Sequence, residues 1–177
     1  MKKGHALFSP FGLAQIAMVA TVAVALWLAF GPWRWGQLKN EVRARFPSVP
    51  LITGEDLAVW MKQPVPQPLL LDARSEAEYN ESHLPGALRA NTPPAQLGIQ
   101  GKVDQPLVIY CTVGFDSGPV AMRFLAQGYK RVQYLEGGIF LWADEGRPLE
   151  NIRGPATKVL PGNSPYVSYL HLSKRAP

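Results

Sequence analysis

Two apolar segments separated by one amphipathic segment constrain the fold of this 177-residue chain most strongly. Residues 106–111, PLVIYC, and residues 132–135, VQYL, are short apolar runs typical of buried strands. Residues 117–129 lie between them and place apolar side chains at helical spacing, with Gly128 as a stop signal. The order strand, helix, strand predicts an α/β fold: a mostly parallel sheet covered by helices on both faces.

Further segments extend this alternation on both sides. Residues 69–72, LLLD, predict a strand bounded by prolines and charges, and residues 87–91 predict a weaker one. A capping-box pattern of Thr53 and Asp56 starts a short helix near Gly54, which the proline-rich residues 64–68 end. Residues 137–146 indicate a glycine turn into a last short helix. We therefore expect one α/β domain over residues 48–150. The Gly- and Pro-rich C-terminal extension, residues 151–177, could pack beside the loop that follows residues 106–111 or against a membrane.

The amino-terminal part has a different composition. Residues 11–30 are twenty residues without a charge, which as a helix rising about 1.5 Å per residue would cover the roughly 30 Å core of a bilayer. The run continues into bulky aromatic residues as far as Trp35, unlike a signal-peptide cleavage site. We expect a short tail over residues 1–10, a transmembrane helix over 11–30 that contacts membrane lipid, and a juxtamembrane connector over 31–47.

The distribution of charge says little about the orientation of the apolar segment or about binding partners. Basic residues flank both ends of the apolar run, so the positive-inside rule does not decide its orientation. The short tail with Lys2 and Lys3 favours a cytoplasmic amino terminus, which would place the domain of a single-pass membrane protein on the extracytoplasmic (periplasmic) side. The net charge of +5 comes from scattered residues rather than a dense patch, so we expect no nucleic-acid partner.

Cys111 is the only cysteine and follows directly from an apolar strand. Ligand sites of parallel sheets lie at the carboxyl ends of the strands, and Gly114 permits the turn that must follow. Inward N–H groups of this turn and the following helix terminus would form an anion cradle and lower the thiol pKa. Position alone is equally compatible with a small apolar core residue. A single cysteine allows no intrachain disulfide, and three dispersed histidines predict no metal site.

Three ordered blocks, residues 69–90, 109–118 and 135–142, resemble the rhodanese family of sulfurtransferases. The resemblance covers about Ser48 to Glu150 and implies a rhodanese-like parallel sheet flanked by helices. The matching residues are Asp72, Arg74, Glu78, Tyr79, His83, Leu84, Gly86 and Ala87 in the first block, Cys111, Gly114 and Ser117 in the second, Gly128 after the next helix, and Leu135, Gly137, Gly138 and Trp142 in the last.

The resemblance also implies a reaction. Cys111 would attack the outer sulfur of a donor, become a persulfide, and pass the sulfur to a thiophilic acceptor such as a thiol or cyanide, without metal or organic cofactor. Asp72 and Arg74 would brace the site as an ion pair, and Trp142 would belong to the core. The loop backbone would bind the anionic persulfide through Thr112, Val113, Gly114, Phe115, Asp116 and Ser117.

The loop departs from the family at two positions. The usual loop resembles Cys-Arg-x-Gly-x-Arg, and here Thr112 and Asp116 replace the arginines. Unit charges about 7 Å apart interact by about 2 kcal/mol at an effective dielectric constant near 20, so Asp116 should raise the thiol pKa and repel an anionic donor. We expect thiosulfate to be a poor donor and a protein persulfide or a less charged sulfane to be a better one. Asp116 is also placed to cap the helix that starts at Ser117.

Other functions fit the loop less well. Phosphatases of related fold have a cysteine loop one residue longer that ends in arginine, whereas position 117 is serine. A thioredoxin-like redox function lacks a second cysteine. The alternative from another class is a rhodanese-like module that binds partners or senses persulfides without turnover, because the loop retains Cys111 but lacks its arginine.

Overall fold

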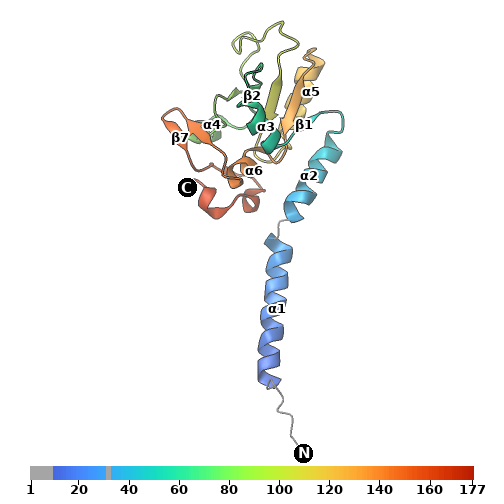
Figure 1. Cartoon of the computed structure of the whole chain (residues 1–177), viewed down its shortest axis with the longest axis vertical. Helices are drawn as coiled ribbons and strands as arrows, with labels where there is room; N and C mark the ends of the chain where they lie inside the picture. Colours follow the sequence, from blue (N-terminus) through green and yellow to red (C-terminus); the bar gives the residue numbers. More distant parts are fainter. Residues whose placement is uncertain (1–9, 31–32) are drawn as a thin grey trace, which may run out of the picture. The chain divides into compact units, whose positions relative to one another are not determined.

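The computed structural model describes residues 10–30 and 33–177 and divides into two compact units, with the boundary between Gln37 and Leu38. The amino-terminal unit contains α1, Pro10–Phe30, and the first turn of α2, Trp33–Arg45 (Figure 1). Across the described ranges, no helix has both the length and the hydropathy required to cross a membrane. A helix is thus present where the sequence predicts one, but the predicted membrane anchor is not supported. Most of the expected tail lies outside the described residues, and the expected extracytoplasmic location stays a prediction.

Within the segment expected to be a connector, residues 31–47, the structure has the helix α2 over Trp33–Arg45. Leu38, Val42 and Phe46 recur every four residues, so they form one apolar stripe along the last turns of α2 and the residue after it. All three side chains are buried in the second unit. These three apolar residues are few among polar and basic neighbours. The overall composition of the segment is therefore polar and does not reveal its buried face.

The second unit is built on a five-stranded sheet in which every neighbouring pair of strands is parallel. The strand order is β1-β5-β4-β2-β3, which makes β4 the central strand. The predicted parallel α/β sheet is confirmed, although β1 consists of only two residues and carries no recognisable pattern. The strands are β1 Leu51–Ile52, β2 Leu69–Asp72, β3 Leu88–Arg89, β4 Leu107–Tyr110 and β5 Val132–Leu135.

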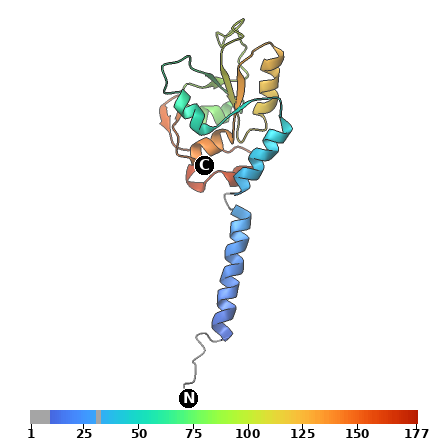
Figure 2. The same ribbon diagram turned by 45° about the vertical axis from the view of Figure 1, so that its right-hand side comes forward.

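Helices cover both faces of this sheet, and Figure 2 shows α5 and α3 on opposite sides of it. On the α5 side, Ile109 and Tyr134 of the strands pack in one cluster with Phe124 of α5 and with Val42 and Phe46. Local sequence starts two of the helices: the Thr53 hydroxyl accepts a hydrogen bond from the Asp56 amide, and Ser75 and Glu78 form a complete capping box. The helices are α3 Gly54–Trp60, α4 Glu76–Glu81, α5 Ser117–Ala126 and α6 Gly138–Asp144.

The C-terminal extension packs on the domain. The antiparallel hairpin of β6, Leu149–Asn151, and β7, Gly154–Ala156, joins it to the domain, and two short 3₁₀ helices, Val167–Tyr169 and Leu172–Lys174, lie near its end. Between them the chain passes the loop that follows β4, where the ring of Tyr166 stacks on that of Phe115 with 5.4 Å between centroids. Of the two positions that the sequence leaves open, the structure therefore has the extension beside the active loop.

Candidate active site

Cys111 lies directly after the central strand β4, at the carboxyl edge of the sheet, where ligand sites of parallel sheets occur. Its side chain is buried, with 1% of the residue exposed. The Gly114 amide donates a hydrogen bond to Sγ over 3.1 Å, and the amides of Ser117 and Asp116 also act on the sulfur. The loop therefore directs backbone N–H groups at the thiol, as the sequence predicts.

The shape of this loop depends on Gly114. Its φ of +122° is a conformation that residues with a side chain rarely adopt, and a Cβ there would lie 3.1 Å from Cγ1 of Val42. The Ser117 hydroxyl closes the turn by donating to the Gly114 carbonyl over 2.8 Å. The loop is thus fixed from inside by Ser117 and from outside by the apolar stripe of α2.

The glycine pair before α6 supports the loop from its other side. Gly138 has a φ of +56°, and a Cβ at this position would lie 2.4 Å from the carbonyl oxygen of Cys111. The next two amides, of Ile139 and Phe140, donate to the carbonyls of Cys111 and Thr112 over 2.9 and 3.1 Å. The close approach of Gly138 to the Cys111 carbonyl therefore fixes the backbone at the cysteine. It also gives a physical reason for glycine at position 138, in the last of the three sequence blocks.

The pKa of the Cys111 thiol is set by burial, by the charge of Asp116 and by the amides of the loop. Burial raises the pKa of Cys111 above its ordinary value, and the negative charge of Asp116 raises it further. The amides of Gly114, Ser117 and Asp116 lower the pKa but do not compensate for burial. The sequence correctly predicts the direction of the Asp116 effect. The sequence also predicts a lowering of the thiol pKa by the helix terminus, opposed by Asp116. Burial, the largest cause of the raised pKa, cannot be read from loop composition.

Asp116 occupies the N-cap position of α5 but makes no capping hydrogen bond with its side chain. Its backbone is already helical, with φ −81° and ψ −21°, which does not suit the usual cap geometry. The side chain is exposed at the end of the loop. The position expected for a cap is therefore confirmed, whereas the capping bond is not made, and the carboxylate remains available to act on whatever enters the site.

A pocket of about 380 Å³ opens beside the loop. One wall belongs to the loop and includes Thr112, Phe115 and Asp116, and Glu78 of α4 adds a carboxylate. The opposite wall comes from the C-terminal extension, which sequence reasoning did not assign to the site: Asn163, Ser164, Pro165 and Tyr166. The aromatic Tyr166 is the only signal for this wall that the sequence offers, because the segment lies far from any of the three blocks.

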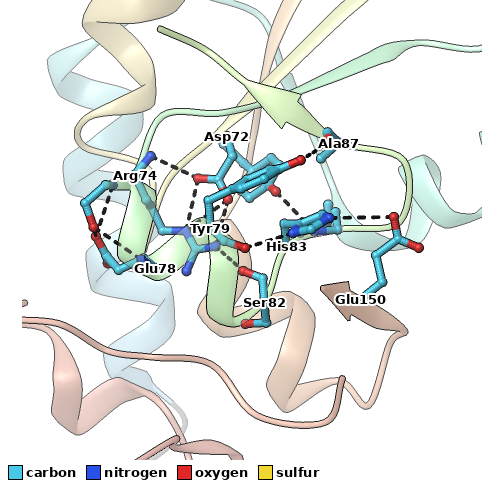
Figure 3. A network of polar contacts seen from close by, with 11 residues as sticks. Asp72, Arg74, Glu78, Tyr79, Ser82, His83, Ala87 and Glu150 are labelled. Atoms are coloured by element: carbon cyan, nitrogen blue, oxygen red, sulfur yellow. Dashed lines mark hydrogen bonds and ion pairs between the residues drawn. The ribbon is translucent and has the colours of Figure 1, made fainter. Parts of the chain in front are cut away.

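Asp72 and Arg74 form a buried ion pair (Figure 3), and neither residue lines the pocket. Arg74 Nη2 lies 2.7 Å from Asp72 Oδ2 and also donates to the Ser82 carbonyl over 2.5 Å. The pair thus joins the end of β2 to the segment after α4. The predicted bracing contact between Asp72 and Arg74 is present.

Two neighbouring groups extend this network toward the extension. The rings of Tyr79 and His83 stack with centroids 4.0 Å apart, and His83 Nε2 lies 3.7 Å from Glu150 Oε1 (Figure 3). Backbone hydrogen bonds pair His83 with Glu150 as an isolated bridge. The first sequence block is therefore a structural brace that connects α4 to the β6–β7 hairpin.

A second brace fixes the glycine pair and was not expected from the sequence. Glu136, buried at the end of β5, forms ion pairs with Lys39, at 3.1 Å, and with Arg43, both from α2. Because Glu136 directly precedes Gly137, these contacts hold α2 over the turn that contacts Cys111. In residues 10–30 and 33–177, no group of three or more His, Cys, Asp or Glu side chains is placed to hold a metal ion.

Comparison with known proteins agrees with this architecture. The family model described as a rhodanese-like domain matches residues 53–145. The chain belongs to the rhodanese family. A sulfurtransferase from Allochromatium vinosum is 37% identical over 83 residues, which are 46% of this chain and 77% of that protein. A thiosulfate sulfurtransferase from Azotobacter vinelandii is 31% identical over 126 residues, and the match covers 59% of this chain but 46% of that protein.

Solved structures show the same fold. A rhodanese-like domain from Anabaena sp. has a TM-score of 0.52 and 21% identity, and the alignment covers 58% of this chain and 80% of that one. The BH2092 protein from Bacillus halodurans has a TM-score of 0.55 and 24% identity, covering 73% of this chain and 97% of that one. In the present rhodanese chain, the matched range of 53–145 contains Cys111 and its loop, whereas the stripe of α2 and the second wall of the pocket lie outside it.

Proposed function

We propose that this protein is a sulfurtransferase that moves a sulfane sulfur from a donor to a thiophilic acceptor through a persulfide on Cys111. The observation that carries the proposal is the 3.1 Å hydrogen bond from the Gly114 amide to Sγ, in a loop at the carboxyl end of β4. Amides aimed at the sulfur stabilise negative charge on it in the thiolate, both as the attacking group and as the leaving group. The relatives named sulfurtransferases support the same reaction class.

The reaction needs two displacements at sulfur. In the first, the Cys111 thiolate attacks the outer sulfur of the donor, the bond from that sulfur to the donor breaks, and the donor leaves with the electron pair. In the second, an acceptor thiolate attacks the outer sulfur of the persulfide, and Cys111 leaves as a thiolate. The amides of Gly114, Asp116 and Ser117 act on the sulfur of Cys111, which carries negative charge before the first step and after the second.

The donor is proposed to be a protein persulfide or a sulfane of low negative charge rather than thiosulfate. Asp116 is exposed at the pocket, at the position where the usual loop of the family has an arginine. A thiosulfate dianion that approaches Cys111 would meet the charges of Asp116 and Glu78 in that pocket. Asp116 also raises the pKa of Cys111, in addition to burial, and so disfavours the thiolate that must attack the donor.

The test is to incubate the protein with thiosulfate, a polysulfide and a small organic persulfide, and to measure its intact mass. Addition of one sulfur atom that is absent in Cys111→Ser supports the proposal. A subsequent incubation with cyanide or a thiol should return the original mass and release thiocyanate or a new persulfide. If no donor adds sulfur to Cys111, the enzymatic function is excluded.

One observation favours a second candidate function, a rhodanese-like module that binds or senses persulfides without turnover. Cys111 is 1% exposed and its pKa is raised, so its thiolate is scarce and covered. The same mass experiment separates the two functions. A sensor would accept sulfur and keep it in the presence of acceptors, whereas a transferase would release it repeatedly.

A further inference from the structure

The pocket beside Cys111 contains charge of one sign. Among the residues that line it, Glu78 and Asp116 are charged, and neither Lys nor Arg lines it. Arg74 interacts with Glu78, but the charge of Arg74 is already neutralised by its buried pair with Asp72. A molecule that reaches Cys111 therefore enters a site with net negative charge, between the loop and the C-terminal extension.

The position of Glu78 is fixed by its own helix. Its carboxylate accepts hydrogen bonds from the Ser75 hydroxyl over 2.5 Å and from the Ser75 amide over 3.1 Å, as part of the capping box. The extension passes close to it, because a Cβ built at Gly162 would lie 3.3 Å from Glu78 Oε1. This carboxylate therefore cannot rotate away from the pocket without breaking the cap of α4.

The opposite wall adds aromatic surface. Tyr166 stacks on Phe115, and both rings line the pocket. Burial raises the pKa of the Tyr166 hydroxyl, and the charges of Glu41 and Asp116 raise it further, so a third carboxylate, from α2, also acts on this wall. Aromatic faces and carboxylates both attract cations, and the two occur together here.

We propose that this pocket selects a sulfur acceptor with a positive charge, such as a small aminothiol, and disfavours an anionic thiol. The proposal rests on the sulfurtransferase function and names its acceptor class. A volume of about 380 Å³ suits a small molecule. Glu78 and Asp116 give the pocket its negative charge and therefore select for a positive charge on that molecule. In the transfer step the thiolate of the aminothiol attacks the outer sulfur of the Cys111 persulfide, the S–S bond breaks, Cys111 leaves as thiolate, and the product is an aminoalkyl persulfide.

The experiment uses the full chain loaded with one sulfur on Cys111. Its rate of discharge is measured with cysteamine, 2-mercaptoethanol and mercaptoacetate, which are cationic, neutral and anionic at neutral pH. These thiols differ in intrinsic reactivity, so the quantity compared is the ratio of the cysteamine rate to the mercaptoacetate rate in each variant. Any effect of a variant on Cys111 as leaving group is common to both thiols and cancels in that ratio.

Asp116→Asn and Glu78→Gln should each lower the ratio about fivefold, since each removes an exposed or half-buried charge that attracts one thiol and repels the other. The Glu78→Gln variant retains a side chain that can complete the capping box, so the fold of α4 should persist. Asp104→Asn is the matched control, because Asp104 is exposed, pairs with Lys130 and precedes β4 at the end opposite Cys111. A ratio that is the same in all four proteins would overturn the proposal.

A second measurement separates this inference from the sulfurtransferase function. The unloaded thiol is treated with aminoethyl and sulfonatoethyl methanethiosulfonate, which form mixed disulfides on Cys111 and release methanesulfinate. Preference for the cationic reagent that is lost in Asp116→Asn supports the charge selection even if no donor loads sulfur, in which case only the transfer function fails. Sulfur transfer without preference in either assay rejects the charge selection alone.

Discussion

At the residue scale, the chemistry of Cys111 depends on a competition between burial and backbone amides. Burial in the loop favours the neutral thiol, and Asp116 adds to this effect. Three amides favour the thiolate, but each supplies a partial charge, whereas burial removes the hydration of a full charge. The resting state is therefore mainly a protonated thiol at neutral pH, and the same amides become more important once negative charge is on the sulfur.

This balance predicts an alkaline pH profile for the reactivity of Cys111. The thiolate is the reactive form, so a pKa raised above the ordinary value of about 8.5 means that the rate is low at neutral pH and keeps rising as pH increases through that value. Iodoacetamide modification, followed by mass at a series of pH values, should show a midpoint above about 8.5. Asp116→Asn should move the midpoint to lower pH, and by less in high salt because Asp116 is exposed. A wild-type midpoint in the normal range would contradict the role of burial.

Asp116 also permits a direct test of the charge at the loop. Asp116→Arg replaces a repulsive charge with an attractive one, so thiosulfate:cyanide turnover should rise about tenfold or more. Asp116→Asn should give an intermediate value, because it removes the repulsion without adding an attraction. Turnover is measured as thiocyanate formed at subsaturating thiosulfate. If both variants match the wild type, the loop charge does not govern donor choice.

At the scale of elements, the sequence predicts those parts that carry a period or a cap. The apolar runs of β2, β4 and β5 and the helical spacing of α5 are long enough to be recognised, and the structure confirms them. The two-residue β1 is defined only by its partner β5, so no local signal exists. The polar α4 was missed although Ser75 and Glu78 show the capping-box spacing, because six residues give too few turns for a period.

The contact between α6 and the active loop gives the prediction at this scale. Gly138→Ala places a methyl group 2.4 Å from the Cys111 carbonyl oxygen and 2.6 Å from that of Thr112, both backbone atoms that can move only at a cost in stability. We expect a loss of more than about 3 kcal/mol in the free energy of unfolding, since packing conflict adds to backbone strain. Gly146→Ala is the control, because Gly146 also has a positive φ but no atom within 4 Å of its Cβ position.

Urea unfolding of the two variants measures the difference. Gly146→Ala should cost about 1 to 2 kcal/mol, which is the strain of the left-handed conformation alone. Gly138→Ala should also slow sulfur loading on Cys111, because relief of the clash moves the carbonyls that the loop starts from. Equal losses of stability in both variants would show that the loop adapts to the methyl group.

At the scale of the whole molecule, the folding unit is larger than the range that the family resemblance covers. The family match is 53–145, but the compact unit is Leu38–Pro177. The amino-terminal addition buries Val42 and Phe46 against the loop and α5, and the carboxyl-terminal addition supplies a wall of the pocket. Neither could be deduced from the three sequence blocks, since each depends on tertiary contact between segments that have no shared pattern. Cys111 and its loop could be predicted from the sequence, whereas the two segments that cover the loop could not.

The packing of these two additions on the domain predicts that fragments lacking them will be less stable than residues 38–177. Residues 38–177 should unfold as one cooperative unit, and residues 48–150 should be markedly less stable. Loss of Val42 and Phe46 removes two side chains whose burial is worth about 1.5–3 kcal/mol each, a large share of the typical 5–15 kcal/mol of a domain. The ring of Phe46 lies so close to α5 that a Cβ at Gly118 would overlap it, so the cavity left behind is lined by the helix that carries the active loop.

Thermal unfolding followed by circular dichroism, with residues 38–150 as the intermediate fragment, separates the two additions. The step from 38–177 to 38–150 should expose the pocket by removing the wall around Tyr166, and therefore speed modification of Cys111 by bulky thiol reagents. The step from 38–150 to 48–150 should lower Tm by more than about 10 °C, because a 1 kcal/mol loss shifts a domain of this size by roughly 4 °C or more. Equal Tm values for 38–150 and 48–150 would mean that the stripe of α2 covers the loop without stabilising it, and Glu136 would then be the residue that keeps α2 in place.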